Sequence, residues 1–332
     1  MLTDSLLVAP RVDPSTARLA WDGYCADPFV LRADDGYYMY GTDPTGDCSD
    51  GRVFPLLHSH DTLHWTSLGG ALEPPSDRTP ASSFWAPEVV ARNGSYWMYY
   101  STGIEDTGHH LRVARAEHPA GPFRDCGVDL TPDLPFAIDP SPYQDLDGKW
   151  WMLFATDDLR GPRPGTVIAV TRMAKPDELA PGHRVILRAT SDWQRYERDR
   201  PIYGGTHDWH TLEGPCIVRH LDHHWLLYSG GNWQGPGYGV AAARATSMTG
   251  PWEAFTEGPS VLSTDEAAGL PGPGHNSVVK APDGTDLAVF HAWDVVGERR
   301  RPHTAPLHWL PTLTAHESSR GSGTSAMIPV TA

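Results

Sequence analysis

Cysteine is scarce in this chain of 332 residues, which contains only Cys25, Cys48, Cys126 and Cys216. No two of them form a Cys-x-x-Cys pair, so we expect no structural zinc site. Free cysteine is among the most frequently buried residue types, and small buried side chains are the expectation here. The first ten residues lack the basic and apolar regions of a secretory signal, which predicts reduced thiols and a cytoplasmic location.

Long apolar runs and positive charge are also lacking. No stretch of about 18 apolar residues occurs, so no membrane-spanning segment is expected. The 26 Lys and Arg residues are outnumbered by 41 Asp and Glu residues, which gives a formal net charge of −15. Proteins that bind nucleic acid through its phosphates need the opposite balance. We therefore expect neither a membrane nor a nucleic acid as a partner.

Glycine, proline and aromatic residues are abundant instead. The chain has 33 Gly, 31 Pro, 13 Trp and 12 Tyr residues without a low-complexity run. This composition is typical of many short strands joined by tight turns. The aromatic residues suit both β structure and stacking against sugars, and their number alone does not separate the two causes.

One sequence unit occurs five times. Each copy begins with a short segment, which in most copies opens with an acidic or small residue beside proline. In most copies an Asp-Gly or Asn-Gly turn follows. Each copy then ends with a run of aromatic and apolar residues. The copies cover residues 26–40, 85–100, 138–157, 213–228 and 275–290. Asp-Gly or Asn-Gly between two such runs is a strong hairpin signal. Repetition at intervals of about 50–75 residues indicates a repeat architecture.

The repeats predict an all-β fold. A single hairpin cannot bury its own face, whereas a ring of four-stranded sheets can. We therefore expect a five-bladed β-propeller of four-stranded antiparallel blades. The expected boundaries are an N-terminal leader over 1–20, the catalytic propeller over 21–315 and a C-terminal tail over 316–332, in which Met327–Val330 is a candidate closing strand. Residues 190–211 read as an irregular insertion that walls the substrate site.

Three of the repeated units have an acidic residue at or near their start. Alignment of the units on their aromatic runs places Asp27, Asp139 and Glu213 at equivalent positions, which in a propeller gather around the central axis. Gathering like charges raises the pKa of each and costs free energy. Glycoside hydrolysis needs such a group, since one carboxylic acid protonates the leaving oxygen and one carboxylate activates water or attacks the sugar. A third acid can keep the proton on the general acid.

The motifs that carry these acids resemble glycoside hydrolase family 43 over about residues 20–310. They are Ala-Asp-Pro at 26–28, Phe-Trp-Ala-Pro-Glu at 84–88, Ile-Asp-Pro-Ser at 138–141, Glu-Gly-Pro at 213–215 and Gly-His-Asn-Ser at 274–277. The resemblance implies a five-bladed propeller and inverting chemistry. It also implies that Asp27 is the general base and Glu213 the general acid. Asp139 would then be the acid that modulates the pKa of Glu213 and orients it.

The resemblance implies further site residues. His275 resembles a histidine that in relatives contacts a central calcium ion or its waters. Histidine is a poor ligand for calcium, so a water-mediated contact and a purely polar role both stay open. No cofactor is required by the expected chemistry. The candidates for substrate binding are Trp21, Phe84, Trp85, Asn232, Trp233, His275, Arg300 and Arg301, and which of the two arginines contacts substrate is open.

The stretches 229–233, 272–277 and 290–294 look most like members that act on arabinan and release arabinose. The predicted function is an inverting, exo-acting α-L-arabinofuranosidase that releases arabinose from arabino-oligosaccharides. The predicted partner is an oligosaccharide or a plant cell-wall polysaccharide. The alternatives are a β-xylosidase, an exo-galactanase or an endo-arabinanase on the same scaffold, or a propeller that binds carbohydrate without catalysis.

Overall fold

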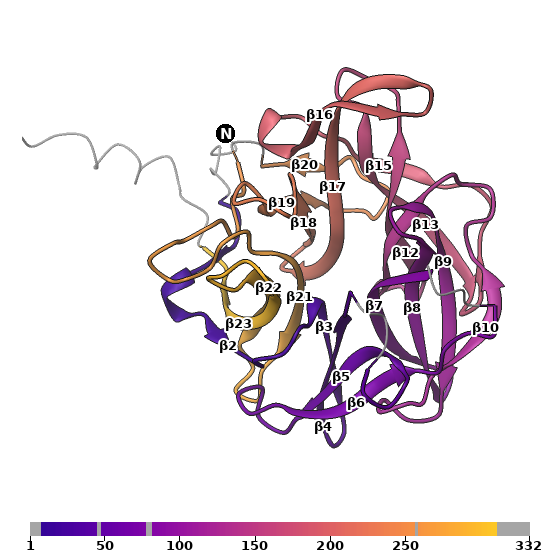
Figure 1. Ribbon diagram of the computed structural model, residues 1–332, viewed down its shortest axis with the longest axis vertical. Helices are drawn as coiled ribbons and strands as arrows, with labels where there is room; N and C mark the ends of the chain where they lie inside the picture. Colours follow the sequence, from indigo (N-terminus) through magenta and orange to yellow (C-terminus); the bar gives the residue numbers. More distant parts are fainter. Residues whose placement is uncertain (1–7, 45–47, 78–81, 256–257, 311–332) are drawn as a thin grey trace, which may run out of the picture.

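The computed structural model describes residues 8–44, 48–77, 82–255 and 258–310. In these ranges the strands form five blades around a central axis, as Figure 1 shows. The first blade consists of β3 (Ala26–Ala33), β4 (Gly36–Thr42), β5 (Val53–Ser59) and β6 (Thr66–Leu72). The second consists of β7 (Ser82–Arg92), β8 (Ser95–Ile104), β9 (Thr107–Ala116) and β10 (Arg124–Asp129).

The third and fourth blades share one continuous sheet. The third contains β11 (Ala137–Gln144), β12 (Trp150–Asp158), β13 (Gly165–Lys175), β14 (Glu178–Leu179) and β15 (Arg184–Leu187). The fourth contains β16 (Arg195–Ile202), β17 (Gly205–His220), β18 (His223–Gly230), β19 (Gly239–Ala245) and β20 (Glu253–Ala254). A short parallel pairing joins them, in which Gly165 and Thr166 of β13 face His210 and Thr211 of β17.

The fifth blade is completed by the N-terminal segment. Its strands are β21 (Gly274–Lys280), β22 (Asp286–Trp293) and β23 (Arg300–His308), and β23 also pairs with β1 (Arg11–Val12) and β2 (Arg18–Leu19). The segment expected as a leader therefore supplies the outer edge of this blade. The expected tail and its closing strand lie outside the described residues.

Turn chemistry explains the hairpins. Between β7 and β8, Asn93 and Gly94 both have positive φ, as a two-residue turn between twisted strands requires. The structure has only two short 3-10 helices in the described ranges, η1 (Pro14–Thr16) and η2 (Asp192–Gln194). No helix among the described residues has the length and apolar character needed to cross a membrane.

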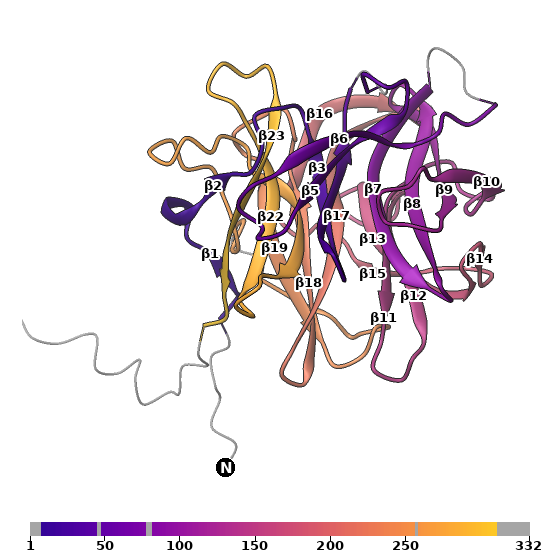
Figure 2. The ribbon, with the colours of Figure 1, turned by 90° about the horizontal axis from the view of Figure 1, so that it is seen from below.

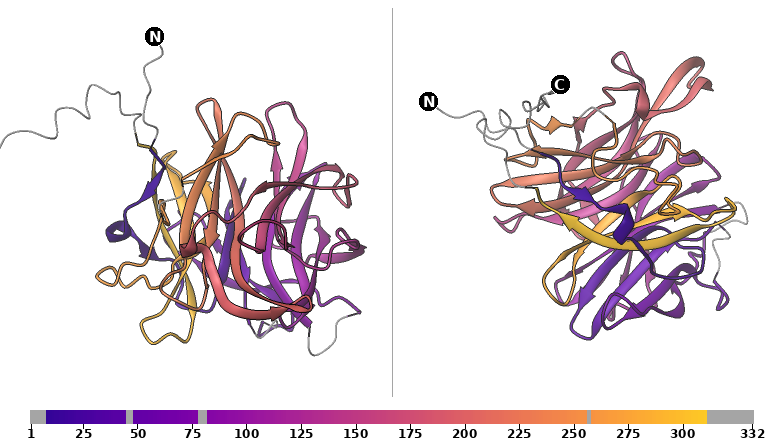
Figure 3. Two further views of the ribbon diagram at one scale, coloured as in Figure 1. Left: turned by 90° about the horizontal axis from the view of Figure 1, so that it is seen from above. Right: turned by 90° about the vertical axis from the view of Figure 1, so that its left-hand side faces the viewer.

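The expectation for residues 190–211 is wrong, because most of this stretch is regular. Strands β16 and β17 form an antiparallel hairpin whose turn contains Tyr203 and Gly204, both with positive φ. Its strands are rich in charged residues, which have low strand propensity, so composition did not reveal it. In the side views of Figures 2 and 3 this hairpin lies at one end of the propeller.

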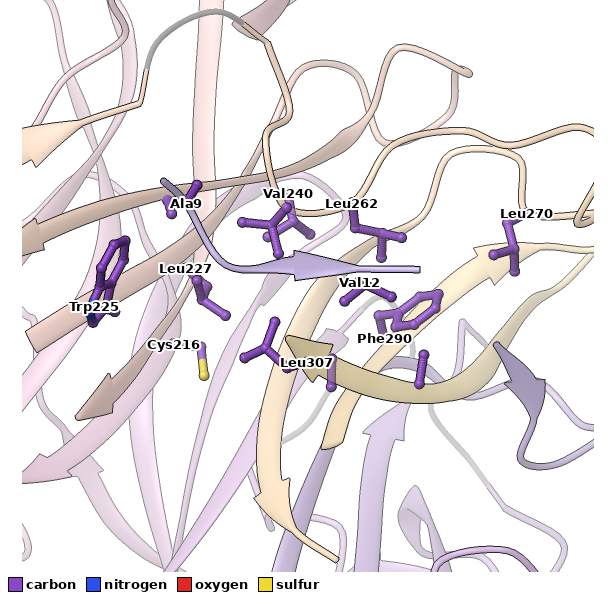
Figure 4. Packing of buried hydrophobic residues seen from close by; sticks show 14 of the residues in the cluster. Ala9, Val12, Cys216, Trp225, Leu227, Val240, Leu262, Leu270, Phe290 and Leu307 are labelled. Carbon is purple, nitrogen blue, oxygen red and sulfur yellow. The ribbon is translucent and has the colours of Figure 1, made fainter. Parts of the chain in front are cut away.

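The core is divided among the interfaces between blades. One cluster joins the fourth and fifth blades, where Leu227 and Cys216 pack with Phe290 and Leu307, and Val12 of β1 covers them (Figure 4). Cys25 is also buried, whereas Cys126 is exposed, so the expected burial of the cysteines holds for part of the set.

The N-terminal strand offers a test of its role in closing the ring. Val12 is 6% exposed within the cluster between the fourth and fifth blades, whereas its neighbour Arg11 is exposed. We expect V12A to lower the free energy of unfolding by about 1.5–2 kcal/mol, because two buried methyl groups are lost. R11A should change it by less than about 0.5 kcal/mol. Urea unfolding measures both, and equal effects would contradict the packing of β1.

Candidate active site

A kink recurs in all five innermost strands. In each, the ladder is interrupted by a bulge, and one residue adopts a left-handed backbone. The residues and their φ angles are Asp27 (50°), Ala86 (48°), Asp139 (58°), Gly214 (56°) and His275 (49°). Such bulges re-aim side chains next to active sites. Three of these five positions carry ionisable side chains.

The predicted equivalence of the three acids needs a correction. Asp27 and Asp139 occupy the left-handed position, but Glu213 lies one residue earlier, because Gly214 takes that position. Glu213 is therefore equivalent to Trp85 and Ile138, which also precede the kink. The Glu213 side chain therefore leaves the backbone one residue before the kink, whereas those of Asp27 and Asp139 leave it at the kink. All three side chains nevertheless reach one cavity.

That cavity has a volume of about 280 Å³ and lies at the heads of the innermost strands. Asp27, Asp139 and Glu213 line it together. Asp27 is 8% exposed and Asp139 is 6% exposed, so their charges are largely withdrawn from water. The other lining residues are Tyr24, Thr42, Pro44, Ser83, Trp85, Asp106, Ile138, Trp233, His275 and Arg300.

Asp27 is surrounded by cationic and imidazole groups. Its Oδ1 lies 3.3 Å from Nη1 of Arg300 and 3.3 Å from Nδ1 of His275. Burial by itself would raise the pKa of Asp27, but His275 and Arg300 outweigh burial and hold that pKa well below its usual range. Asp27 is therefore ionised at neutral pH, as a carboxylate that accepts a proton from water must be.

His291 binds the backbone of Asp27 as a neutral ring. The backbone N–H of Asp27 donates to Nδ1 of His291 at 3.0 Å, which requires an unprotonated nitrogen. Burial lowers the pKa of His291 to about 4, consistent with this neutral state. Since Nδ1 accepts this bond, it does not donate to the Asp27 carboxylate, and the charge of Asp27 is stabilised chiefly by His275 and Arg300.

Glu213 and Asp139 have the opposite electrostatic environment. Burial, and next the charge of Asp139, raise the pKa of Glu213 to about 7. Tyr238 opposes this shift, since its hydroxyl donates to Oε1 of Glu213 at 2.5 Å. Burial and then the charge of Asp27 raise the pKa of Asp139 to about 7. Each of these two carboxyl groups is therefore partly protonated near neutral pH, and a protonated Glu213 is the state that the predicted general acid needs.

Several other expected site residues also reach the cavity. Trp85 lines it and stacks on His109 with ring centroids 3.6 Å apart. Trp233 also lines the cavity and stacks on Trp293, and the Arg300 guanidinium lies 4.5 Å from the centroid of the Trp233 ring. These contacts fix the two tryptophans as rigid walls.

Three expected residues lie elsewhere. Phe84 is 3% exposed and packs in the core against Phe54 and Tyr100. Trp21 packs beside a separate hydrophobic cluster of the first and fifth blades. Arg301 pairs with Asp22 and Asp294 on the other side of β23. None of the three lines the cavity around the acids.

Asn232 acts on the site indirectly. Its Nδ2 donates to the carbonyl of Tyr196 at 3.2 Å, and its Oδ1 accepts from the backbone of Gln234. Asn232 thereby ties the loop that carries Trp233 to the β16–β17 hairpin. Sequence reasoning missed Tyr238, Tyr24 and His291, because their positions within repeats showed no chemical pattern.

A second cavity of about 280 Å³ adjoins the first. The two cavities share Trp85, Asp106, Ile138, Glu213 and Trp233, so Glu213 stands between them. The hairpin supplies the far wall through Tyr196, Arg200, Ile202, Tyr203, Trp209 and Thr211. The expectation that this stretch walls the site agrees with its position, although its structure differs from the expected loop.

The hairpin wall is held by polar contacts. Tyr203 donates to Oδ2 of Asp157 at 2.7 Å, and Thr166 donates to Oδ1 of the same carboxylate. The Arg200 guanidinium lies 5.1 Å from the ring centroid of Tyr196 and 5.6 Å from that of Trp209. Aromatic faces with a few directed polar groups form the type of surface that binds a sugar ring.

The residues around the acids bear on the predicted calcium ion. Among the described residues, no three His, Cys, Asp or Glu side chains converge as a ligand set. The Nδ1 atom of His275 faces Asp27, and imidazole is a poor calcium ligand. Water-mediated calcium binding at His275 therefore stays a prediction.

A family comparison identifies the scaffold. The model of the glycosyl hydrolases family 43 matches residues 21–311 of this chain. The chain belongs to this family. Family 43 enzymes are inverting glycoside hydrolases, and the resemblance proposed from the motifs is confirmed.

Relatives of this family 43 protein differ in their named activities. It is 26% identical to "Beta-D-galactofuranosidase xynD" of Aspergillus niger, over 90% of this chain and 82% of that protein. It is also 26% identical to "Extracellular exo-alpha-(1->5)-L-arabinofuranosidase ArbA" of Cellvibrio japonicus, over 85% of this chain and 83% of that protein. Among solved structures, a thermostable family-43 glycoside hydrolase superposes with a TM-score of 0.76 at 24% identity, covering 96% and 98% of the two chains. This last likeness supports the five-bladed fold.

The bond from Tyr238 predicts a shift in pH dependence. With Glu213 as the predicted general acid, hydrolysis needs its protonated form, so kcat/KM should fall as the pH rises through about 7, the pKa of this residue. Y238F removes a hydrogen bond that stabilises the Glu213 carboxylate, which raises the pKa further. We expect the alkaline limb of the pH–rate profile to move to higher pH.

Tyr228 provides the matched control, because it is buried in the core and lines neither cavity. Y228F also removes a buried phenol hydroxyl and should leave the alkaline limb in place. An unchanged or acid-shifted limb in Y238F would contradict the role assigned to Tyr238.

Proposed function

We propose that this protein is an exo-acting α-L-arabinofuranosidase that releases arabinose from arabino-oligosaccharides with inversion. The observation that carries the proposal is the position of Glu213 between two small cavities. One cavity holds the ionised Asp27 and has room for one sugar ring. The other, walled by the hairpin, receives the leaving group, so that the scissile oxygen lies at Glu213.

The proposed reaction is a single displacement. The Asp27 carboxylate takes a proton from a water molecule, and the water oxygen forms a bond to the anomeric carbon. The bond from that carbon to the leaving oxygen breaks, and Glu213 gives its proton to this oxygen. Attack from the face opposite the leaving group inverts the anomeric configuration. Proton exchange with solvent then restores both acids.

The neighbouring residues support each step. Arg300 and His275 keep Asp27 ionised, and Tyr238 occupies Oε1 of Glu213, which leaves Oε2 to carry the proton. The charge of Asp139 helps to hold that proton on Glu213. The walls formed by Trp85 and Trp233 fit the apolar face of a sugar ring.

A β-D-galactofuranosidase is the second candidate, because a relative with this name aligns with 90% of the chain. Both candidates act on furanosides, whose flexible five-membered rings fit the same small cavity. Activity toward xylopyranosides or galactans and endo action on arabinan are weaker alternatives. A binding protein without catalysis would gain nothing from a buried trio of acids, since their mutual repulsion costs free energy.

A substrate panel distinguishes these functions. We expect release of nitrophenol from nitrophenyl α-L-arabinofuranoside, and weaker or no release from the β-D-galactofuranoside, β-D-xylopyranoside and β-D-galactopyranoside. Proton NMR of early products should show the inverted anomer. On arabino-oligosaccharides, monomeric arabinose should be the first product. Longer first products would indicate endo action, and silence on every substrate would favour a binding protein.

The general acid has its own test. We expect E213Q to reduce kcat on arabino-oligosaccharides by about 10²–10⁴-fold, because the departing alkoxide then receives no proton. The loss should be much smaller on a dinitrophenyl glycoside, whose leaving group needs no protonation. E253Q, which alters an exposed surface carboxylate paired with Arg244, should leave both rates unchanged. Full activity of E213Q on oligosaccharides would overturn the assignment.

A further inference from the structure

The kinks in the innermost strands are tied to the neighbouring blades. Four of the five blades carry a polar acceptor on their second strand, paired with the residue that precedes the kink. The acceptors are Thr42, Ser101, Ser229 and His291, all at most 2% exposed. Each accepts a hydrogen bond from the left-handed residue of the next blade, at 2.8, 3.4, 2.8 and 3.0 Å respectively.

The third blade breaks this pattern. The residue paired with Ile138 is Ala155, which is fully buried and whose methyl group cannot accept a hydrogen bond. The neighbouring hydroxyl of Thr156 is engaged with the carbonyl of Phe136 at 2.7 Å. The N–H of Gly214, the left-handed residue of the fourth blade, instead donates to Oδ2 of Asp139 at 2.9 Å.

The exception coincides with a strand pairing between two blades. Only this pair of blades, among the described residues, shares one sheet through the pairing of β13 with β17. Backbone hydrogen bonds from Phe123 to Ala71 and from Glu73 to Phe123 also join the first and second blades, and that interface keeps its Thr42 acceptor. The strand pairing therefore accompanies the exception without accounting for it. The N–H of Gly214 is available to a carboxylate, and a bond to a charged acceptor is stronger than one to a hydroxyl.

The position of Gly214 gives this bond a consequence for chemistry. Gly214 directly follows Glu213, so the bond holds the Asp139 carboxylate against the backbone beside the general acid. Asp139 has other groups that could attract or repel it, and His275 Nδ1 lies 3.9 Å away. The charged or titratable groups facing it are Asp27, Glu88, Glu213, His275 and Arg300. Without the bond, the Asp139 carboxylate would be free to move toward His275 and Arg300.

We propose that Ala155 is a positioning residue of this active site, because the missing acceptor reserves the Gly214 N–H for Asp139 and so fixes that carboxylate beside Glu213. The inference rests on the proposed hydrolase function for its kinetic consequence. The hydrogen-bond exchange itself is a property of the fold and can be measured without any substrate.

The test restores the missing acceptor with A155S. Its hydroxyl would occupy the place of the Thr42, Ser101 and Ser229 hydroxyls in other blades and would compete for the Gly214 N–H. We expect kcat to fall about tenfold, by the loss of one bond to a charged group, while KM changes by less than about twofold. A purely structural defect would instead reduce the fraction of active enzyme and the thermal stability.

Two control variants separate the acceptor from other effects. A155G alters the same position without adding an acceptor, and its kcat should stay within about twofold of wild type. A241S buries a hydroxyl in the same hydrophobic cluster, on β19 of the fourth blade. It should also keep kcat within about twofold. Equal losses in A155S and either control would overturn the proposal.

A spectroscopic measurement tests the bond even where A155S does not fold. The sequence contains only two Glu-Gly pairs, at 213–214 and 257–258. Labelling with carbonyl-13C glutamate and 15N glycine therefore gives two amide signals in an HNCO spectrum. We expect the Gly214 proton to resonate downfield, as a donor to a carboxylate, and to move upfield in D139N and in A155S.

The Gly258 signal serves as the internal reference and should not move. A Gly214 signal that stays in place in D139N would show that Asp139 is not its acceptor, and the proposal would fail. This result is independent of activity. If the protein hydrolysed no glycoside but the Gly214 signal moved as expected, the proposed function would fail while the assigned hydrogen-bond exchange would stand.

Discussion

The structure depends on one backbone constraint, the left-handed residue that bends each innermost strand. A non-glycine residue in this conformation costs about 1–2 kcal/mol, and four of the five blades accept this cost. Aspartate tolerates the conformation better than most residues, which suits Asp27 and Asp139. The bend releases a backbone N–H from the ladder, and the adjoining blade provides its acceptor. The same device that links the blades therefore directs ionisable side chains to the axis.

The three acids differ because their partners differ. Asp27 lies against Arg300 and His275 and stays charged, whereas Glu213 lies beside Asp139 and keeps its proton. Burial acts on all three in the same direction, so burial alone could not divide them into base and acid. The division comes from the placement of Arg300 and His275 on the fifth blade, against Asp27. Environments that push the pKa values of paired carboxyl groups apart are the basis of acid–base catalysis.

The hairpin of the fourth blade forms a wall of the second cavity. Because β17 continues from the hairpin directly to Glu213, part of the wall of the second cavity and Glu213 belong to one strand. Under the proposed function, changes in the hairpin would therefore alter leaving-group recognition close to Glu213. The related proteins act on different sugars by name, and variation in such walls on a common propeller provides a physical reason.

The sequence by itself determined the number of blades and the hairpins, and it singled out three acids that the structure brings to one cavity, because these depend on local patterns that repeat along the chain. It did not separate Arg300 from Arg301, since only alternation along β23 sends one to Asp27 and the other to Asp22. It also placed Phe84 and Trp21 at the site, although packing buries the first and moves the second away. Only the tertiary structure decided the offset of Glu213, the bond from Tyr238 and the exception at Ala155, because each joins residues of different strands or blades, whose approach no local pattern encodes.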